Sequence, residues 1–155
     1  SNAVDWKKQN LNLLKQNYKK SQYFDEIFPY VEKLYAQNLE KLADFNMASI
    51  LMILELFDIK IAIKYSSSFK TLRTKSERLV DLLIMTDASH YLSGLGAKGY
   101  HDDRPFNDAK IEVLWQNFQH PIYSQLYGDF IQNLSSIDLF FNCGIEQSRK
   151  ILRRC

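Results

Sequence analysis

The chain has 155 residues, of which 46% are hydrophobic and 25% charged, and its formal net charge is +2. This length and balance are typical of a globular domain with a packed core and argue against a disordered chain. A charge so close to zero also argues against a basic nucleic-acid-binding surface. The two cysteines, Cys143 and Cys155, are too few for a disulfide framework, which favours a reducing cytoplasm.

Three helices are predicted in the first third of the chain. Asp5 can cap the first, which carries an apolar stripe. A second segment opens at Ser21, with Pro29 tolerated near a fresh helix start. Asp44 can cap the third, over 45–57, which is apolar nearly all round and is therefore expected to be central and buried.

Three strands are predicted in the second half. The alternating, β-branched stretch over 60–65 predicts the first, and 89–93 and 111–118 predict the other two. A capping box formed by Thr74 and Glu77 opens a helix that runs to about Thr86. Because the connections are long enough for crossovers, a small parallel sheet of about three strands with right-handed βαβ units is expected.

The remaining segments complete the predicted fold. An irregular loop over 119–128 precedes a helix that Ser135 or Ser136 caps and that ends at Gly144, and a last helix is basic. The fold class is therefore α/β, with a helical first third and a helical C-terminus. Residues 1–3 (SNA) are typical of a tag-cleavage scar, so a single domain is predicted over 4–155 and the natural protein is expected to begin upstream. The most apolar run, over 50–57, is far shorter than the roughly 20 residues that cross a bilayer, so no membrane span is expected.

The stretch GLGAKG, over 94–99, fits the G-x-G-x-x-G pattern of dinucleotide-binding proteins. That pattern requires a long helix starting inside it, and Pro105 makes such a helix doubtful. It also requires an acidic residue about 20 positions later, where this chain has only amides. The phosphate-binding P-loop fails as well, because Gly99 is followed by Tyr100 and His101. A dinucleotide site is therefore rejected.

A simpler anion site remains open at the same loop. Ligands of open parallel sheets bind beyond the carboxyl ends of the strands, so the backbone amides of Gly94, Gly96 and Gly99, with Lys98, can bind a phosphate or carboxylate. The alternative is that the glycines only supply positive φ angles for a tight turn. Ser67, at the end of the first predicted strand, is either a ligand contact or a turn residue. Arg78 is either an anion contact or a surface partner of Asp81.

Titratable side chains gather around the same loop. His101, Asp102 and Asp103 are candidate metal ligands or an acid/base pair, and His90 and His120 complete a zinc set only if the fold brings them together. No metal site is predicted on this basis, and no cofactor is identified. Neither cysteine has a base beside it, so nucleophilic catalysis has no local support.

Several runs of the sequence closely resemble one known family. They are QNYKKSQYFDEIFPYVEKLY (16–35), LADFNMASI (42–50), TKSERLVDLL (74–83), LSGLGAKGYHDD (92–103) and IEVLWQNFQHPIYSQLYGDFIQNLSSIDLFFNCG (111–144). In this order they resemble the C-terminal part of the WbqC-like family of bacterial proteins. The resemblance covers nearly the whole chain but lacks the N-terminal portion that family members usually carry.

The resemblance implies a link to bacterial surface-polysaccharide (O-antigen-type) biosynthesis and a transferase that places an acyl or aminoacyl group on a sugar. The family pattern touches two loops, which are expected to line one cleft, at Ser93, Gly94, Gly96, Gly99, Tyr100 and Asp102 and at His120, Pro121, Tyr123, Gln125 and Asn133. Asp138 and Asn142, four positions apart on one helix face, are expected to have a structural role.

Two functions follow from these observations. The first is a cytoplasmic enzyme site for a phosphorylated or nucleotide-linked sugar. There, Lys98 and the glycine amides bind the anion and His101, Asp102 or His120 acts as acid or base. The second is a non-catalytic protein-interaction module with an aromatic docking surface, Phe118, Tyr123, Tyr127 and Phe130. A homo-oligomer is compatible with either function.

Overall fold

The computed structural model describes residues 5–154. Its helices and strands are α1 (Trp6–Tyr18), α2 (Phe24–Tyr35), α3 (Leu42–Phe57), α4 (Lys75–Ile84), β1 (His90–Ser93), α5 (Arg104–Asp108), β2 (Glu112–Trp115) and α6 (Ser136–Leu152). Two short 3-10 helices, η1 (Ser66–Ser68) and η2 (Leu95–Ala97), precede α4 and α5. The backbone divides into unit 1, Ser1–Ile61 with Gln119–Cys155, and unit 2, Ala62–Phe118. The single domain over 4–155 stays a prediction.

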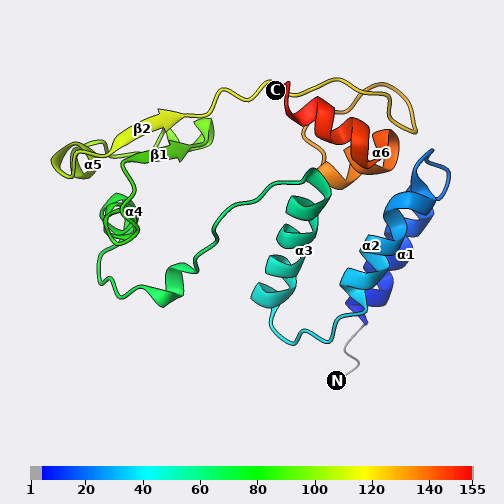
Figure 1. Ribbon diagram of the computed structural model, residues 1–155, viewed down its shortest axis with the longest axis horizontal. Coiled ribbons are helices and arrows are strands. Elements are labelled where there is room, and N and C mark those ends of the chain that lie inside the picture. The colour runs from blue at the N-terminus through cyan, green and yellow to red at the C-terminus, as the bar shows by residue number, and fades with distance from the viewer. Residues whose placement is uncertain (1–4, 155) are drawn as a thin grey trace. The chain divides into compact units, whose positions relative to one another are not determined.

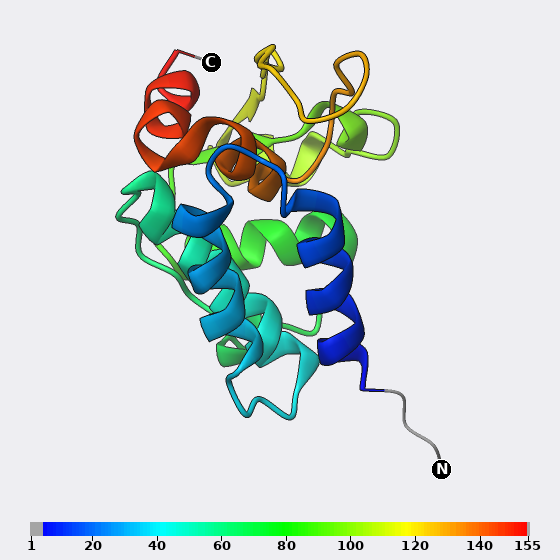
Figure 2. The ribbon, with the colours of Figure 1, turned by 90° about the vertical axis from the view of Figure 1, so that its right-hand side faces the viewer.

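Unit 1 is helical. Its α1 and α2 run antiparallel, side by side, as Figure 2 shows, and α2 also packs against α3 and α6 (Figure 1). The core that these helices share is rich in aromatic side chains, and its fully buried members include Ile27, Leu56, Phe140 and Phe141. The helical first third and the helical C-terminus are therefore confirmed.

The helix boundaries in unit 1 follow the local sequence in part. The Asp5 carboxylate accepts a hydrogen bond of 3.1 Å from the backbone N–H of Lys8, as predicted for a cap. The predicted helix start at Pro29 is wrong, because α2 begins at Phe24 and contains Pro29. A proline inside a helix has no N–H to donate, and the packing of the amphipathic α2 compensates for that loss.

Two expectations for α3 are also wrong. The helix begins at Leu42, with Lys41 in the capping position, so Asp44 lies in its first turn and does not cap it. The helix is not buried on all sides either, since it packs only through one side and leaves Leu42, Ile50 and Leu51 about half exposed or more. An apolar composition predicts burial only where a partner covers the surface.

The sharp break in α6 is confirmed. Ser135 caps the helix by accepting a hydrogen bond from the N–H of Ile137. Gly144 has φ +72° and ψ 173°, so the helix breaks there and resumes in a new direction. A Cβ at this position would lie 2.6 Å from the ring of Tyr23, which only glycine avoids.

Unit 2 contains the sheet. Strands β1 and β2 pair in parallel, with His90 opposite Glu112 and Ser93 opposite Trp115 (Figure 1). Its small core consists of Val80, Phe106 and Ile111, surrounded by partly buried side chains. Two of the three predicted strands are therefore confirmed, and the right-handed βαβ crossover stays a prediction.

The predicted strand over 60–65 is not formed in the described residues. This segment is irregular, and its apolar side chains, such as Ile61 at 61% exposure, do not face a core. Alternation alone does not make a strand, because a strand also requires a hydrogen-bonded neighbour. The capping box before α4 is wrong too. Thr74 is in the capping position, but its side chain makes no capping hydrogen bond.

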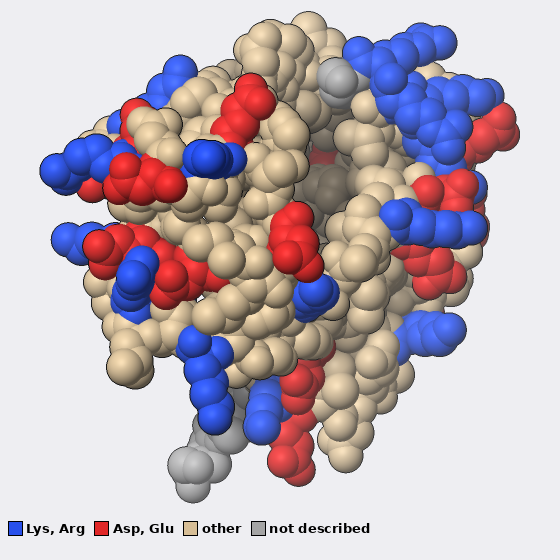
Figure 3. All heavy atoms as spheres, turned by 60° about the vertical axis from the view of Figure 1, so that its left-hand side comes forward, with Lys and Arg blue, Asp and Glu red and all other residues tan. Residues whose placement is uncertain are grey.

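Charged side chains are interspersed over the surface. On the face in Figure 3, Lys and Arg alternate with Asp and Glu, although basic groups gather at the upper right of the view. In residues 5–154, no helix is long and apolar enough to cross a membrane.

Candidate functional site

A hollow of about 460 Å³ lies in unit 2 between the start of α4, strand β1 and the loop that follows β1. Its lining is mostly apolar, but it contains an ammonium, three hydroxyls and an imidazole. The lining residues are Lys75, Ser76, Leu79, Tyr91, Ala97, Tyr100 and His101. Such a mixture of an apolar wall and a few polar groups is typical of small-molecule sites.

His101 is the most unusual residue of this hollow. Its side chain is only 5% exposed, and its ring packs 4.8 Å from that of Phe106 and 5.1 Å from that of Trp115. The Nε2 atom lies 3.1 Å from a carboxylate oxygen of Asp103, but the two do not have hydrogen-bond geometry. Nε2 is therefore a buried polar atom without a hydrogen bond, which is costly and rare in folded proteins.

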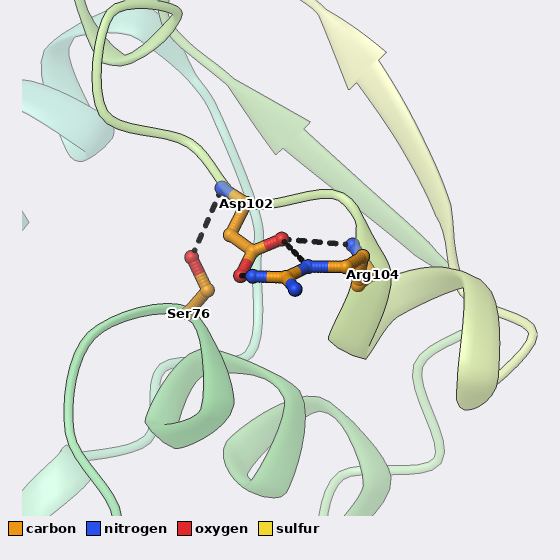
Figure 4. Close-up of polar contacts among 3 residues, drawn as sticks. All are labelled: Ser76, Asp102 and Arg104. Carbon is orange, nitrogen blue, oxygen red and sulfur yellow. Dashed lines mark hydrogen bonds and ion pairs between the residues drawn. The ribbon is translucent and has the colours of Figure 1, made fainter.

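Asp102, a predicted acid/base candidate beside His101, makes several hydrogen bonds. Its carboxylate accepts hydrogen bonds from Nε and Nη2 of Arg104, at 3.0 and 2.9 Å, and its backbone N–H donates to Oγ of Ser76 at 3.4 Å (Figure 4). The hydrogen bonds from Arg104 hold the pKa of the Asp102 carboxyl below its usual value. A carboxylate in this state is a weak base, so its geometry favours holding the loop against α4.

The glycine loop does not have the backbone conformation that one interpretation of it required. Gly128 and Gly144 are the described glycines with positive φ, so Gly94, Gly96 and Gly99 do not serve to supply such angles. A Cβ built on any of these three would meet no atom within 4 Å. Neither the turn nor the packing of the protein therefore requires glycine at these positions.

The other predicted ligand residues of unit 2 surround this loop unevenly. Tyr100 lines the hollow and is 80% exposed. Lys98 places its ammonium 5.3 Å from the ring centre of Trp115. Ser93 is buried at the end of β1, and Ser67 lies in the exposed η1. Arg78 is half-buried on α4 and does not pair with Asp81, which binds Thr71 and Arg73.

The remaining predicted site residues belong to unit 1. His120 donates from Nδ1 to the carbonyl oxygen of Pro121, at 3.0 Å, and its ring packs against Phe130. Tyr123 and Gln125 both donate to the carboxylate of Asp138, at 2.8 and 3.0 Å. The expectation that both loops line one cleft stays a prediction.

Asp138 is the centre of a buried network in unit 1. It is 5% exposed, and its second oxygen accepts a hydrogen bond of 2.9 Å from the hydroxyl of Tyr18. Burial, and then the hydrogen bond to Asp138, raises the pKa of Tyr123 to about 12, and the same causes raise the pKa of Tyr18 further. Burial and the nearby Asp138 charge also raise the pKa of the Cys143 thiol. Asn142 donates to the backbone oxygen of Asp138, so the expected structural role of this pair is supported.

The histidines do not assemble with other ligands into a metal centre. His90 lies across the sheet from Glu112, with 3.3 Å between Nε2 and the carboxylate. Within residues 5–154, no group of three or more His, Cys, Asp or Glu side chains is placed to hold a metal ion.

Comparison with known proteins gives a family. The family model described as "WbqC-like protein family" matches residues 1–150. The chain belongs to this WbqC-like family. It is also 30% identical to an uncharacterized protein of Mycobacterium tuberculosis over 155 residues, which is 99% of this chain and 67% of that protein. No solved structure matches it.

In this WbqC-like chain, the structure adds residues that the sequence did not single out. Lys75, Ser76 and Tyr91 line the hollow, and Asp103 rather than Asp102 lies beside the imidazole of His101. One signal was present in the sequence: a helix start and a glycine loop both follow predicted strand ends. The sequence does not show that the helix start and the glycine loop lie against each other, because that contact depends on the fold of unit 2.

Proposed function

We propose that this WbqC-like protein is a transferase of bacterial surface-polysaccharide biosynthesis that binds a phosphorylated or nucleotide-linked sugar in the cytoplasm. The observation that carries the proposal is a hollow of about 460 Å³ whose mostly apolar lining includes the ammonium of Lys75 and the side chain of His101. Such a combination of an apolar wall and a few polar groups is typical of small-molecule sites. The link to polysaccharides and to transfer chemistry comes from the family resemblance.

The shape and lining of the hollow support a ligand of this class. Tyr91, Tyr100 and Leu79 provide apolar surface for a sugar ring or a base, and Lys75 provides a positive charge for a phosphate. The open space above Gly94, Gly96 and Gly99 leaves their backbone accessible to the same ligand.

His101 is the proposed acid/base residue. In the transfer of an acyl group, the sugar hydroxyl loses its proton to the imidazole as its oxygen attacks the carbonyl carbon of the acyl donor. The bond between that carbon and the departing group of the donor then breaks, and the imidazolium returns the proton to the departing group. The Asp103 carboxylate, 3.1 Å from Nε2, stabilises the imidazolium that forms. The proposal places the family-pattern residue Tyr100 beside the ligand and leaves Asp102 to hold the loop through Arg104 and Ser76.

A thermal-shift screen tests this proposal. The panel contains sugar phosphates, nucleotide sugars, nucleoside phosphates, coenzyme A and amino acids, and a ligand at 100 times its Kd stabilises by about 2.7 kcal/mol. We expect a sugar phosphate or nucleotide sugar to raise the Tm of the natural sequence and to have much less effect on His101→Phe. A panel without any shift, or equal shifts in both proteins, would overturn the proposal.

A non-catalytic interaction module is the second candidate, and exposed apolar side chains favour it. In the loop after β2, Ile122, Tyr127 and Ile131 are 83%, 60% and 60% exposed. Several exposed apolar side chains in one loop are typical of a surface that contacts another protein. Tyr123 is not part of such a surface, because its hydroxyl is bound to Asp138. The discriminating variant is therefore Tyr127→Ala, which should weaken partner binding and leave ligand binding at His101 unchanged.

A further inference from the structure

We propose that a second hollow, in unit 1, binds an organic cation of the quaternary ammonium class beside the carboxylate of Asp138. This hollow has a volume of about 350 Å³ and lies between the C-terminal end of α1 and the loop that leads into α6. All of its lining residues belong to unit 1, so the site is separate from the sugar site proposed in unit 2. The two hollows also differ in charge, because Lys75 lines the one in unit 2 and Asp138 lines this one.

The lining of the hollow in unit 1 suits a cation with an apolar body. Its apolar surface comes from Leu14 on α1 and from Leu126, Ile131 and Leu134 in the loop. None of the described residues that line it is Lys, Arg or His, so the lining has no positive group that would repel a cation or attract an anion. Apolar walls with a few polar groups, in a hollow of this size, are typical of small-molecule sites.

Asp138 supplies a negative charge that the protein does not pair. The residue is 5% exposed, and its carboxylate accepts hydrogen bonds from Tyr18, Tyr123 and Gln125, which are all neutral donors. No Lys or Arg of the described residues forms an ion pair with it. The positive end of α6 compensates this charge only in part, because a helix terminus carries about half an elementary charge. Since buried charges in proteins are generally paired, a cationic ligand would complete this one.

The hydrogen bonds already made at the site select the class of cation. A primary ammonium has three N–H donors, and each of them needs an acceptor once water is excluded. Here the carboxylate of Asp138 already accepts from three donors, and the amide oxygen of Gln125 accepts from the N–H of Ile131. A quaternary ammonium has no N–H, so it interacts through its charge and through contact with aromatic rings.

Tyr18 and Tyr127 provide the aromatic surface of the hollow. Both line it together with Asp138. Tyr18 is fixed in place, because its ring stacks on Phe141 with 4.4 Å between the ring centres and its hydroxyl donates to Asp138. Tyr127 is 60% exposed, so it can be replaced with little effect on the fold. Aromatic rings beside a negative charge are the environment that stabilises a quaternary ammonium group.

The experiment is a titration of the full 155-residue chain, in which the backbone amide signals are followed in NMR spectra at constant ionic strength. The probes are choline, neohexanol and ethanolamine. Neohexanol has a carbon atom in place of the choline nitrogen, so it keeps the shape and lacks the charge. Ethanolamine keeps the charge but has N–H donors instead of methyl groups. We expect choline to shift the amides of Tyr127, Ile131 and Asp138 and to bind about tenfold more tightly than either other probe.

Two variants locate the binding energy. Tyr127→Leu keeps an apolar side chain and removes the ring, so it should weaken choline about three- to tenfold. Tyr65→Leu is the matched control, because Tyr65 is 47% exposed and belongs to unit 2, and it should change the Kd less than about twofold. Asp138→Asn should remove the preference for choline over neohexanol. If this variant does not fold, the same two probes still test the role of charge in the natural sequence.

Several outcomes would overturn this inference. Equal binding of choline and neohexanol would mean that the hollow selects an apolar shape and not a charge. Tighter binding of ethanolamine than of choline would mean that the site requires N–H donors. Shifts confined to residues away from the hollow, or no binding of choline, would also overturn it. None of these outcomes bears on the proposed function, because the sugar site belongs to unit 2.

Discussion

Asp138 in unit 1 and His101 in unit 2 are both buried polar side chains, but their hydrogen bonding is opposite. The Asp138 carboxylate accepts bonds from Tyr18, Tyr123 and Gln125, whereas Nε2 of His101 has none. A fully bonded buried carboxylate holds parts of a fold together. The imidazole of His101 has the carboxylate of Asp103 beside it, at 3.1 Å from Nε2, but no hydrogen bond that holds it in place.

The glycines of the two units differ in the same way. Gly144 has a positive φ, and a side chain there would contact Tyr23, so the fold of unit 1 requires glycine. Gly94 has φ −74° and open space around it, so the fold of unit 2 does not. The comparison therefore assigns a structural role to Asp138 and Gly144 of unit 1 and no such role to Gly94 of unit 2.

The largest expected effect is on stability when Asp138 is removed. Asp138→Ala leaves the part-buried hydroxyls of Tyr18 and Tyr123 without their acceptor, whereas the Gln125 amide keeps the carbonyl oxygen of Ile131. Each unsatisfied donor costs about 1–3 kcal/mol. We expect the free energy of unfolding to fall by about 3 kcal/mol or more, measured by urea denaturation at pH 7.

His101→Phe is the matched substitution in unit 2. It removes a polar atom that has no hydrogen bond to lose and keeps an aromatic ring of similar size against Phe106 and Trp115. We expect a change in unfolding free energy below about 1.5 kcal/mol. A loss as large as that of Asp138→Ala would contradict the comparison, because it would mean that the contact between His101 and Asp103 stabilises the fold as strongly as the hydrogen bonds of Asp138 do.

The next effect concerns the glycines. Gly144→Ala combines a strained left-handed backbone, which costs roughly 1–2 kcal/mol, with a contact of 2.6 Å to the Tyr23 ring. A destabilisation of about 2–3 kcal/mol is expected in the same urea assay. Gly94→Ala is the control and should change stability by less than about 0.5 kcal/mol. Equal effects at both positions would remove the distinction between the two units.

What could be predicted from the sequence was mostly local. The caps at Asp5 and Ser135 and the break at Gly144 depend on a few neighbouring residues, and they were predicted correctly. The strand over 60–65 failed because strand formation depends on a distant neighbour that its own residues do not specify. Pro29 failed because tertiary packing allows a proline inside α2.

The candidate site was predictable only as a neighbourhood. His101 and the glycine loop could be singled out because chemistry-bearing residues cluster there in the sequence. Lys75 could not, because its place in the hollow depends on how α4 packs against the loop after β1. Asp138 was recognised as structural from its spacing to Asn142, but its bonds to Tyr18 and Tyr123 span 120 and 15 residues and have no sequence signal.

The smallest effect is a dependence of stability on alkaline pH. The pKa of Tyr123 is about 12 in the folded protein and about 10 in an unfolded chain, so the folded state holds this proton more tightly. The stability that results is fully present below pH 10 and is lost as the pH rises from about 10 to 12.

Tyr123→Phe should therefore be less stable at pH 8 but lose less stability between pH 10 and 12, measured by urea denaturation at a series of pH values. Tyr127→Phe, an exposed control, should follow the natural sequence. If all three proteins lost stability in parallel, the network around Asp138 would not hold the Tyr123 proton. The hydrogen bonds that distinguish unit 1 from unit 2 would then contribute no measurable free energy of unfolding.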